Sequence, residues 1–199
     1  MISCTLKELN HNLRSLNLVQ GVNKTAVLYL DIYRIFDGDI KLPELNKPYI
    51  FYIADGSIRL YTPSGILDYI SGQYSVSAID MPFNGQVIAL SEKNDLLALS
   101  IKFTADEVFS VLMSFSGNLA QQIANDKLSS AFTERADKNI TDCIIRLIAL
   151  LNDNISLEFM ANHIKCEILF NVLCGSCGNR FLQSIIGTNQ SGDIYNINA

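Results

Sequence analysis

The feature that most constrains the fold is a change of hydrophobic period at Phe103. From Thr25 to Phe103 the chain consists of short apolar runs rich in β-branched and aromatic residues, separated by turn residues. After Phe103 the apolar residues recur every three or four positions, which is typical of amphipathic helices. Strands first and helices afterwards predict an α+β chain, with a β-barrel followed by a C-terminal set of three to four helices.

The first part predicts about seven strands at close, even spacing. We interpret them as a meander that forms a closed barrel or a sandwich, because closure removes exposed sheet edges. Asp55-Gly56 is a hairpin signal, since both residues tolerate a positive φ. Ser64-Gly65 and Ser71-Gly72 mark further turns.

The second part contains three longer helical patterns. Thr104 and Glu107 have the spacing of a capping box at the start of the first, which continues through Val108, Val111, Leu112, Phe115 and Leu119. The second helix is predicted to open at Thr133, and the third to run to Gly175. A short fourth helix, FLQSII, is predicted to stop at Gly187.

One apolar stripe on the second predicted helix has two interpretations. It either packs back on the barrel or pairs with its copy in another subunit. Its members are therefore the candidate dimer interface: Ala136, Ile140, Cys143, Ile144, Leu147 and Leu151.

These patterns divide the 199 residues into four segments. We expect an N-terminal arm at 1–21, a barrel at 22–103, a helical dimerisation and linker subdomain at 104–187, and a polar tail at 188–199.

Charge and hydropathy exclude two classes of partner. With 15 basic and 20 acidic residues the net charge is −5, so the chain is repelled by phosphate backbones and direct binding of nucleic acid is not expected. No apolar run reaches the roughly 18 residues that span a bilayer, so we expect no membrane association and a cytoplasmic protein.

Five cysteines, an odd number, agree with free thiols in a reducing compartment.

Three stretches of the sequence carry a family resemblance: LPELNKPYIFYIADGSIRLY, SGQYSVSAIDMPFNGQVIALSEKNDLLALSIKFTADEV and CEILFNVLCG. In this order they resemble the N-terminal, cupin-type regulatory domain of AraC-family transcriptional regulators, over about residues 22 to 190. The resemblance implies a cupin-like barrel that senses a small-molecule effector, helices that form a homodimer, and DNA binding only through a C-terminal half with two helix-turn-helix motifs. That half is not present in these 199 residues.

The alternative from another class is a free-standing cupin enzyme with an unrecognised site. Metal-carrying cupins resemble one another in having histidines two apart on a barrel strand, where both side chains point to one side. The histidines here are His11 in the arm and His163 in the third predicted helix. We therefore expect no metal, no cofactor and no catalysis, and a bound transition metal would favour the enzyme.

The remaining metal or redox motif is Cys174-Gly-Ser-Cys177. It falls at the C-terminal end of a predicted helix, whereas a reactive thiol is favoured at an N-terminal end. Cys166 and Cys174 are eight positions apart, about 12 Å along one helix, which is too far for both to bind one zinc ion. We interpret these cysteines as structural.

Aromatic and polar residues on the predicted strands are the candidates for an effector-binding lumen. Arg59 and Tyr61 share one face by alternation, with Ile58 and Leu60 on the other. Arg59 is the candidate partner of an effector carboxylate. The alternative is a lumen that is simply packed, with these polar groups pointing outward. The candidate set is Tyr49, Phe51, Arg59, Tyr61, Tyr69, Tyr74 and Gln86.

Overall fold

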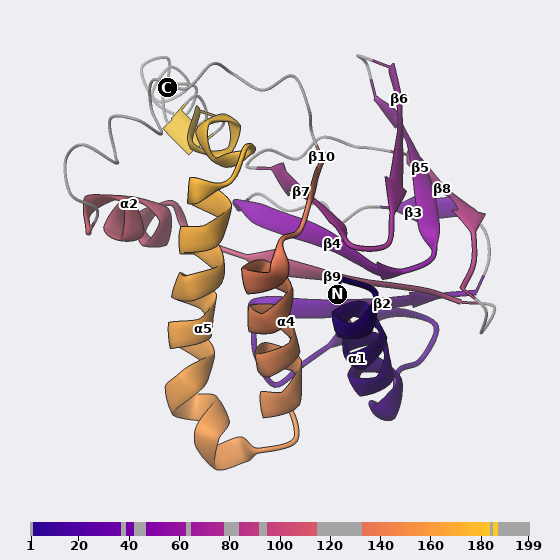
Figure 1. Ribbon diagram of the computed structural model, residues 1–199, viewed down its shortest axis with the longest axis horizontal. Coiled ribbons are helices and arrows are strands. Elements are labelled where there is room, and N and C mark those ends of the chain that lie inside the picture. The colour runs from indigo at the N-terminus through magenta and orange to yellow at the C-terminus, as the bar shows by residue number, and fades with distance from the viewer. Residues whose placement is uncertain are drawn as a thin grey trace, which may run out of the picture.

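The computed structural model describes residues 2–36, 39–41, 47–62, 65–77, 84–91, 95–114, 133–183 and 185–186. Within these ranges the chain has the predicted α+β order, with strands before most of the helices (Figure 1). The strands are β1 (Gly21–Lys24), β2 (Leu30–Ile35), β3 (Asp39–Lys41), β4 (Tyr49–Asp55), β5 (Ser57–Thr62), β6 (Gly65–Ile70), β7 (Gln73–Ser77), β8 (Asn84–Ala89), β9 (Leu96–Lys102) and β10 (Thr133–Arg135). The helices are α1 (Ile2–Ser15), α2 (Ala105–Met113), α4 (Lys138–Leu150) and α5 (Asn154–Cys174).

The strands form two antiparallel sheets and not the meander that the even spacing predicts. One sheet has the order β1-β2-β9-β4-β7-β10 and the other has the order β3-β8-β5-β6. Gly56 and Gly72 have the positive φ expected of their turns, at 88° and 83°. The hairpin predicted at Asp55-Gly56 is nevertheless wrong, because the turn carries the chain from β4 in one sheet to β5 in the other. Ser64 lies outside the described residues.

The boundary between strands and helices also differs from the prediction at Thr133. Residues Thr133–Arg135 form β10, which pairs with β7 at the edge of the larger sheet. Helix α4 begins later, at Lys138, where the Asp137 side chain accepts a hydrogen bond from the Ile140 amide. A strand of three residues is too short to show an alternating pattern, so the sequence offered no signal for it.

Two other helix ends follow the predicted signals. At the start of α2, Thr104 Oγ1 accepts from the Glu107 amide at 3.1 Å and Glu107 Oε2 accepts from the Thr104 amide at 2.8 Å, which confirms the capping box. Helix α5 ends at Cys174 with Gly175 as its C-cap. The described residues 178–183 and 185–186 are helical. Phe115, Leu119 and Gly187 lie outside the described residues.

The N-terminal segment is a helix that docks on the rest of the chain. Leu9 and Leu13 of α1 are fully buried in the core that the helices share with the larger sheet. At the end of α1, Arg14 donates to Asp95 at 2.6 Å and to Asp55 at 2.9 Å. The segment predicted as an arm is therefore held to the barrel by both apolar burial and ion pairs.

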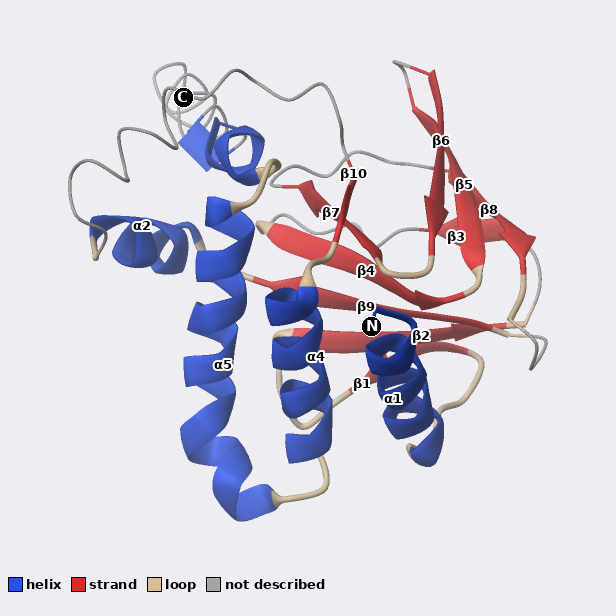
Figure 2. Cartoon of the chain, viewed as in Figure 1, coloured by secondary structure: helices blue, strands red, loops and turns tan. Residues whose placement is uncertain are grey.

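The molecule has two cores, one on each face of the larger sheet. Helices α1, α4 and α5 lie on one face, and the four-stranded sheet lies on the other (Figure 2). The inner surfaces of the two sheets thus enclose a separate core, remote from the helices.

Among the described helices, none combines the length and the apolar character needed to cross a bilayer.

The candidate dimer stripe lies inside this single chain. Five of its six members are at most 3% exposed in the core between the helices and the larger sheet, and Leu151 is partly buried against that core. Because side chains packed within one subunit offer no surface to a second, the structure corrects the dimer interpretation of this stripe. The side chains concerned are Ala136, Ile140, Cys143, Ile144, Leu147 and Leu151.

Candidate functional site

The core between the two sheets is built by strict alternation along strands that are buried on both faces. On β4, Tyr49, Phe51 and Ile53 belong to the core between the sheets, whereas Ile50 and Tyr52 belong to the core under the helices. All five side chains are at most 2% exposed. The surface of β4 that faces the smaller sheet is therefore aromatic and sequestered from water.

A polar cluster interrupts this apolar surface where β2 and β9 pair. Asp31 is opposite Ser100 in the register and, by alternation, on the same face of β2 as Tyr33. Asp31 Oδ2 accepts from Lys24 Nζ at 2.8 Å and pairs with Lys102 Nζ at 2.6 Å. Asp31 is 2% exposed, and its Oδ1 is buried without a hydrogen-bond partner in the described part of the chain.

The hydroxyl groups on the inner surface stay protonated at neutral pH. Burial raises the pKa of Tyr33 to about 12, and the hydrogen bond with Ser100 offsets part of that rise. The two hydroxyl oxygens lie 3.4 Å apart. Burial likewise raises the pKa of Tyr69 to about 12, with Ser75 opposing the shift. The hydroxyls of Tyr33 and Tyr69 therefore keep their ability to donate a hydrogen bond.

Three of the predicted lumen residues lie on this inner surface and four lie elsewhere. Tyr49, Phe51 and Tyr69 belong to the core between the sheets. On β5 the inner residues are Ile58 and Leu60, so Arg59 and Tyr61 point outward. The alternation was predicted correctly, but the choice of face was wrong because apolar side chains occupy the inner one.

Three of the predicted lumen residues, Arg59, Tyr61 and Gln86, lie on the outer surface of the smaller sheet and have partners there. Arg59 makes a bidentate pair with Asp68, at 2.7 and 2.8 Å. Tyr61 donates to the exposed Gln86 at 3.4 Å. Arg59 is thus already paired on the outside and is not placed to meet a carboxylate between the sheets.

Tyr74, the fourth residue, lies on the helix-facing side of β7 and links the barrel to the end of α5. Its hydroxyl donates to Glu134 at 2.8 Å, and Glu134 also accepts from the Ser176 and Cys177 amides at 3.0 Å each. Burial would raise the pKa of Glu134, but these donors outweigh it and hold that pKa below its ordinary value. An ionised carboxylate thus ties β7 and β10 to the segment that follows α5.

Sequence reasoning missed Asp31, although the sequence contains a signal for it. Asp31 is the one acidic residue in the apolar run TAVLYLDIYRIF. A charge within a strand that is buried on both faces is costly unless it is paired, so its presence there indicates a role beyond packing. Identifying the pairing lysines, Lys24 and Lys102, required the sheet register.

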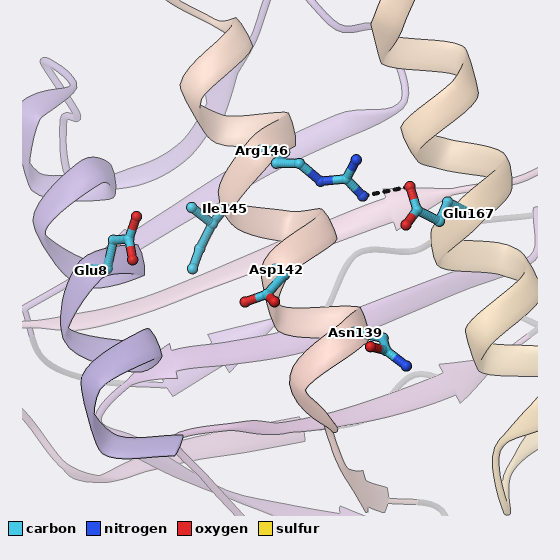
Figure 3. A pocket seen from close by; sticks show the side chains of 6 residues that line it. All are labelled: Glu8, Asn139, Asp142, Ile145, Arg146 and Glu167. Atoms are coloured by element: carbon cyan, nitrogen blue, oxygen red, sulfur yellow. Dashed lines mark hydrogen bonds and ion pairs between the residues drawn. The ribbon is translucent and has the colours of Figure 1, made fainter. Parts of the chain in front are cut away.

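A hollow lies between α1, α4 and α5 (Figure 3). It is an open cleft of about 430 Å³ with three carboxylates and one guanidinium. Arg146 crosses it to pair with Glu167, and Arg146 also donates to Cys143 Sγ at 3.2 Å. The cleft is lined by Glu8, Asn139, Asp142, Ile145, Arg146 and Glu167.

The cysteines and histidines do not converge on a metal within the described part of the chain, where no group of three or more His, Cys, Asp or Glu side chains could hold an ion. Cys174 is exposed at the end of α5, whereas Cys177 is buried. Burial and the nearby Glu134 carboxylate raise the pKa of Cys177 to about 12, which keeps its thiol protonated and unreactive.

Comparison with known proteins gives a family match and a fold match. Residues 26–180 match the profile of the AraC-type transcriptional regulator N-terminus. No curated protein matches the sequence significantly. Among solved structures, ToxT from Vibrio cholerae with bound unsaturated fatty acid aligns with a TM-score of 0.51 at 12% identity, over 68% of this chain and 51% of ToxT.

Two further structures are similar. Another crystal form of ToxT aligns with a TM-score of 0.50 at 13% identity, over 71% of this chain and 52% of ToxT. The AraC-like transcriptional activator CuxR aligns with a TM-score of 0.43 at 14% identity, over 73% of this chain and 51% of CuxR. The chain therefore spans about half the length of these proteins, and its likeness to ToxT confirms the predicted fold class, an α+β chain with a cupin-like barrel.

Proposed function

The chain belongs to the family of AraC-type transcriptional regulator N-termini, and from that premise we propose that it binds a small-molecule effector between its two sheets. The observation that carries this proposal is the buried polar cluster of Asp31, Tyr33 and Ser100 on a largely apolar inner surface. Small-molecule sites combine apolar walls with a few convergent polar groups in this way. That a ToxT structure holds an unsaturated fatty acid supports effector binding by this fold.

A screen of small metabolites by thermal unfolding tests the proposal. A compound that binds only the folded chain must raise its unfolding temperature. Tyr33→Phe or Tyr69→Phe should lower the affinity for such a compound by about tenfold, because each substitution removes a hydroxyl from the inner surface while keeping the ring.

The matched control is Tyr61→Phe, which removes a hydroxyl from the outer surface of the same barrel. Its affinity for the compound should equal that of the wild type. If Tyr61→Phe weakened binding while both inner variants bound normally, the effector site would not lie between the sheets.

For a protein that also carries a DNA-binding half, we assign the barrel at 22–103 to sensing, the helical segment at 104–187 to self-association, and the tail at 188–199 to the connection with that half. The link from Tyr74 through Glu134 to Ser176 and Cys177 supports this division, because it couples β7 to the segment after α5. DNA binding would then belong to the C-terminal half, and the protein would act in the cytoplasm. Catalysis is not part of this assignment.

For self-association we assign the outer face of α5 in place of the buried stripe on α4. Ile155, Phe159 and Phe170 are 90%, 69% and 43% exposed on this helix. They are spaced by four and eleven residues, so they lie on one side of the helix, with the exposed His163 and Cys166 between them. An apolar side of a 21-residue helix is the kind of surface that pairs with a second copy.

Phe159→Glu and Phe170→Glu together should convert a homodimer to a monomer. Two charges placed in an apolar interface are left unpaired, whereas in the monomer both side chains are exposed and the fold is unaffected. Light scattering measures the mass, and far-UV circular dichroism checks the fold. Val22→Glu, on the exposed side of β1, is the control and should remain dimeric. A monomeric wild type, or a dimeric double variant, would contradict this assignment.

A further inference from the structure

The free oxygen of Asp31 points to the chemistry of the effector. We propose that the effector presents a hydrogen-bond donor, a hydroxyl or an ammonium group, to Asp31 Oδ1. The inference rests on the proposed effector site between the sheets and specifies which ligands that site accepts.

The first argument is the cost of leaving Asp31 Oδ1 unpartnered. A carboxylate oxygen carries two acceptor positions, and burying it without a donor costs as much as a lost charged hydrogen bond. Asp31 is 2% exposed, and within the described chain its Oδ1 has no donor. Native structures retain such groups chiefly where a ligand, an ion or a bound water supplies the missing partner.

The second argument is that the carboxylate is held in one orientation. Both lysines contact the same oxygen, Oδ2, at 2.8 Å for Lys24 and 2.6 Å for Lys102. The Lys24 side chain is 74% exposed, so its charge is largely solvated. Because Oδ2 carries both contacts, Oδ1 is left free as an acceptor on the face of β2 shared with Tyr33.

The third argument concerns the neighbours that would surround the ligand. The Tyr33 ring meets Phe51 edge-on, with centroids 5.3 Å apart, and so forms an aromatic wall. The hydroxyls of Tyr33 and Ser100 can each rotate to donate or accept. A ligand with an apolar body and a donor at one end satisfies all of these groups. A carboxylate ligand would instead set acceptor against acceptor at Oδ1, and like charges against each other.

Four small probes with the same aromatic body test the inference: benzyl alcohol, benzylamine, benzoate and toluene. Their dissociation constants for the purified chain are measured by ligand-observed NMR at millimolar concentration. Benzyl alcohol or benzylamine should bind at least about tenfold more tightly than benzoate and toluene, the size expected for one hydrogen bond to a charged group. Which of the two binds more tightly distinguishes a neutral hydroxyl from an ammonium group.

The Asp31→Asn variant provides a more specific test, because the asparagine side chain has nearly the same shape as that of aspartate. The amide oxygen would remain on the lysines, so the amide NH₂ would replace Oδ1 and turn an acceptor into a donor. The preference should then reverse: the variant should bind benzoate about tenfold more tightly than the wild type does, and the donor-bearing probes about tenfold more weakly. Asp68→Asn, on the exposed outer surface, is the matched control and should leave the ranking unchanged.

Several outcomes would overturn the inference. Benzoate binding as tightly as the donors to the wild type would do so, and so would an unchanged ranking in a folded Asp31→Asn variant. If that variant fails to fold, the wild-type ranking decides alone. Benzoate binding that is lost in Tyr33→Phe would reject the donor requirement but retain the site between the sheets. Absence of binding by all four probes would count against both proposals.

Discussion

Ile144→Asp is expected to unfold the chain. Ile144 is fully buried on α4, in the core between the helices and the larger sheet. An aspartate there loses the buried apolar side chain and places an unpaired charge in an apolar site, at a cost above about 4 kcal/mol. Because small domains are stable by only about 5–15 kcal/mol, a loss of this size removes a large part of the native stability, and all of it in a chain near the lower limit.

Urea denaturation, followed by far-UV circular dichroism, measures the effect. The control is Ile66→Asp, which changes the same residue type on the surface of β6, where the side chain is 63% exposed. That variant should unfold at nearly the wild-type urea concentration. A folded, monomeric Ile144→Asp protein would instead restore the interpretation of the α4 stripe as a dimer contact.

Asp95→Ala is expected to destabilise the chain by about 3 kcal/mol, the second-largest effect of those proposed. Asp95 is fully buried and accepts from Arg14 at 2.6 Å, from Ser91 at 2.7 Å and from Arg34 at 3.0 Å. Removing it leaves two partly buried guanidinium groups without this partner and weakens the attachment of α1 to the barrel, which then rests on Asp55 and on apolar burial. The loss should appear as a lower urea midpoint and as faster proteolysis within residues 2–15.

The same residue predicts the direction of the pH dependence. Burial alone would raise the pKa of Asp95, but the donors from Arg14, Ser91 and Arg34 outweigh it and lower that pKa. A carboxyl group whose folded pKa lies below its unfolded value stabilises the fold above the unfolded pKa. That stability is lost as the pH falls through the folded pKa. The difference in stability between wild type and Asp95→Ala should therefore shrink in acid.

The exposed pair Arg59–Asp68 provides the matched comparison for Asp95. It has the same chemistry, with bidentate bonds of 2.7 and 2.8 Å, but both side chains are substantially exposed. Exposed ion pairs contribute little, since solvent screens them. Asp68→Ala should unfold at nearly the wild-type urea concentration. If Asp68→Ala lost as much stability as Asp95→Ala, burial would not be the cause of the difference.

Features that depend on a few neighbouring residues could be predicted from the sequence. The capping box of Thr104 and Glu107, the glycine that ends α5, the positive φ at Gly56 and the turn at Gly72 are all confirmed. Each of these features is decided by the local backbone and by neighbouring side chains, so it does not depend on the tertiary fold. The family resemblance likewise rests on such stretches, and the match over residues 26–180 confirms it.

The sheet topology depends on contacts between distant segments and could not be predicted. Strands β2 and β9 pair although about sixty residues separate them, and β10 joins β7 from beyond α2. The positive φ at Gly56 is compatible with either topology. Only packing decides whether the strand after it pairs with its predecessor or enters a second sheet.

The candidate site shows the same division between local pattern and tertiary packing. By itself the sequence determined that Arg59 and Tyr61 share one face of a strand, and that the residues from Ala136 to Leu151 form an apolar stripe. The period of a strand or helix determines which side chains lie on the same face, because side-chain direction follows from the local backbone geometry. The tertiary structure decided which face is inside, since burial depends on the partner that covers it. It therefore placed Arg59 outward against Asp68, the α4 stripe within its own chain, and the free oxygen of Asp31 in the core.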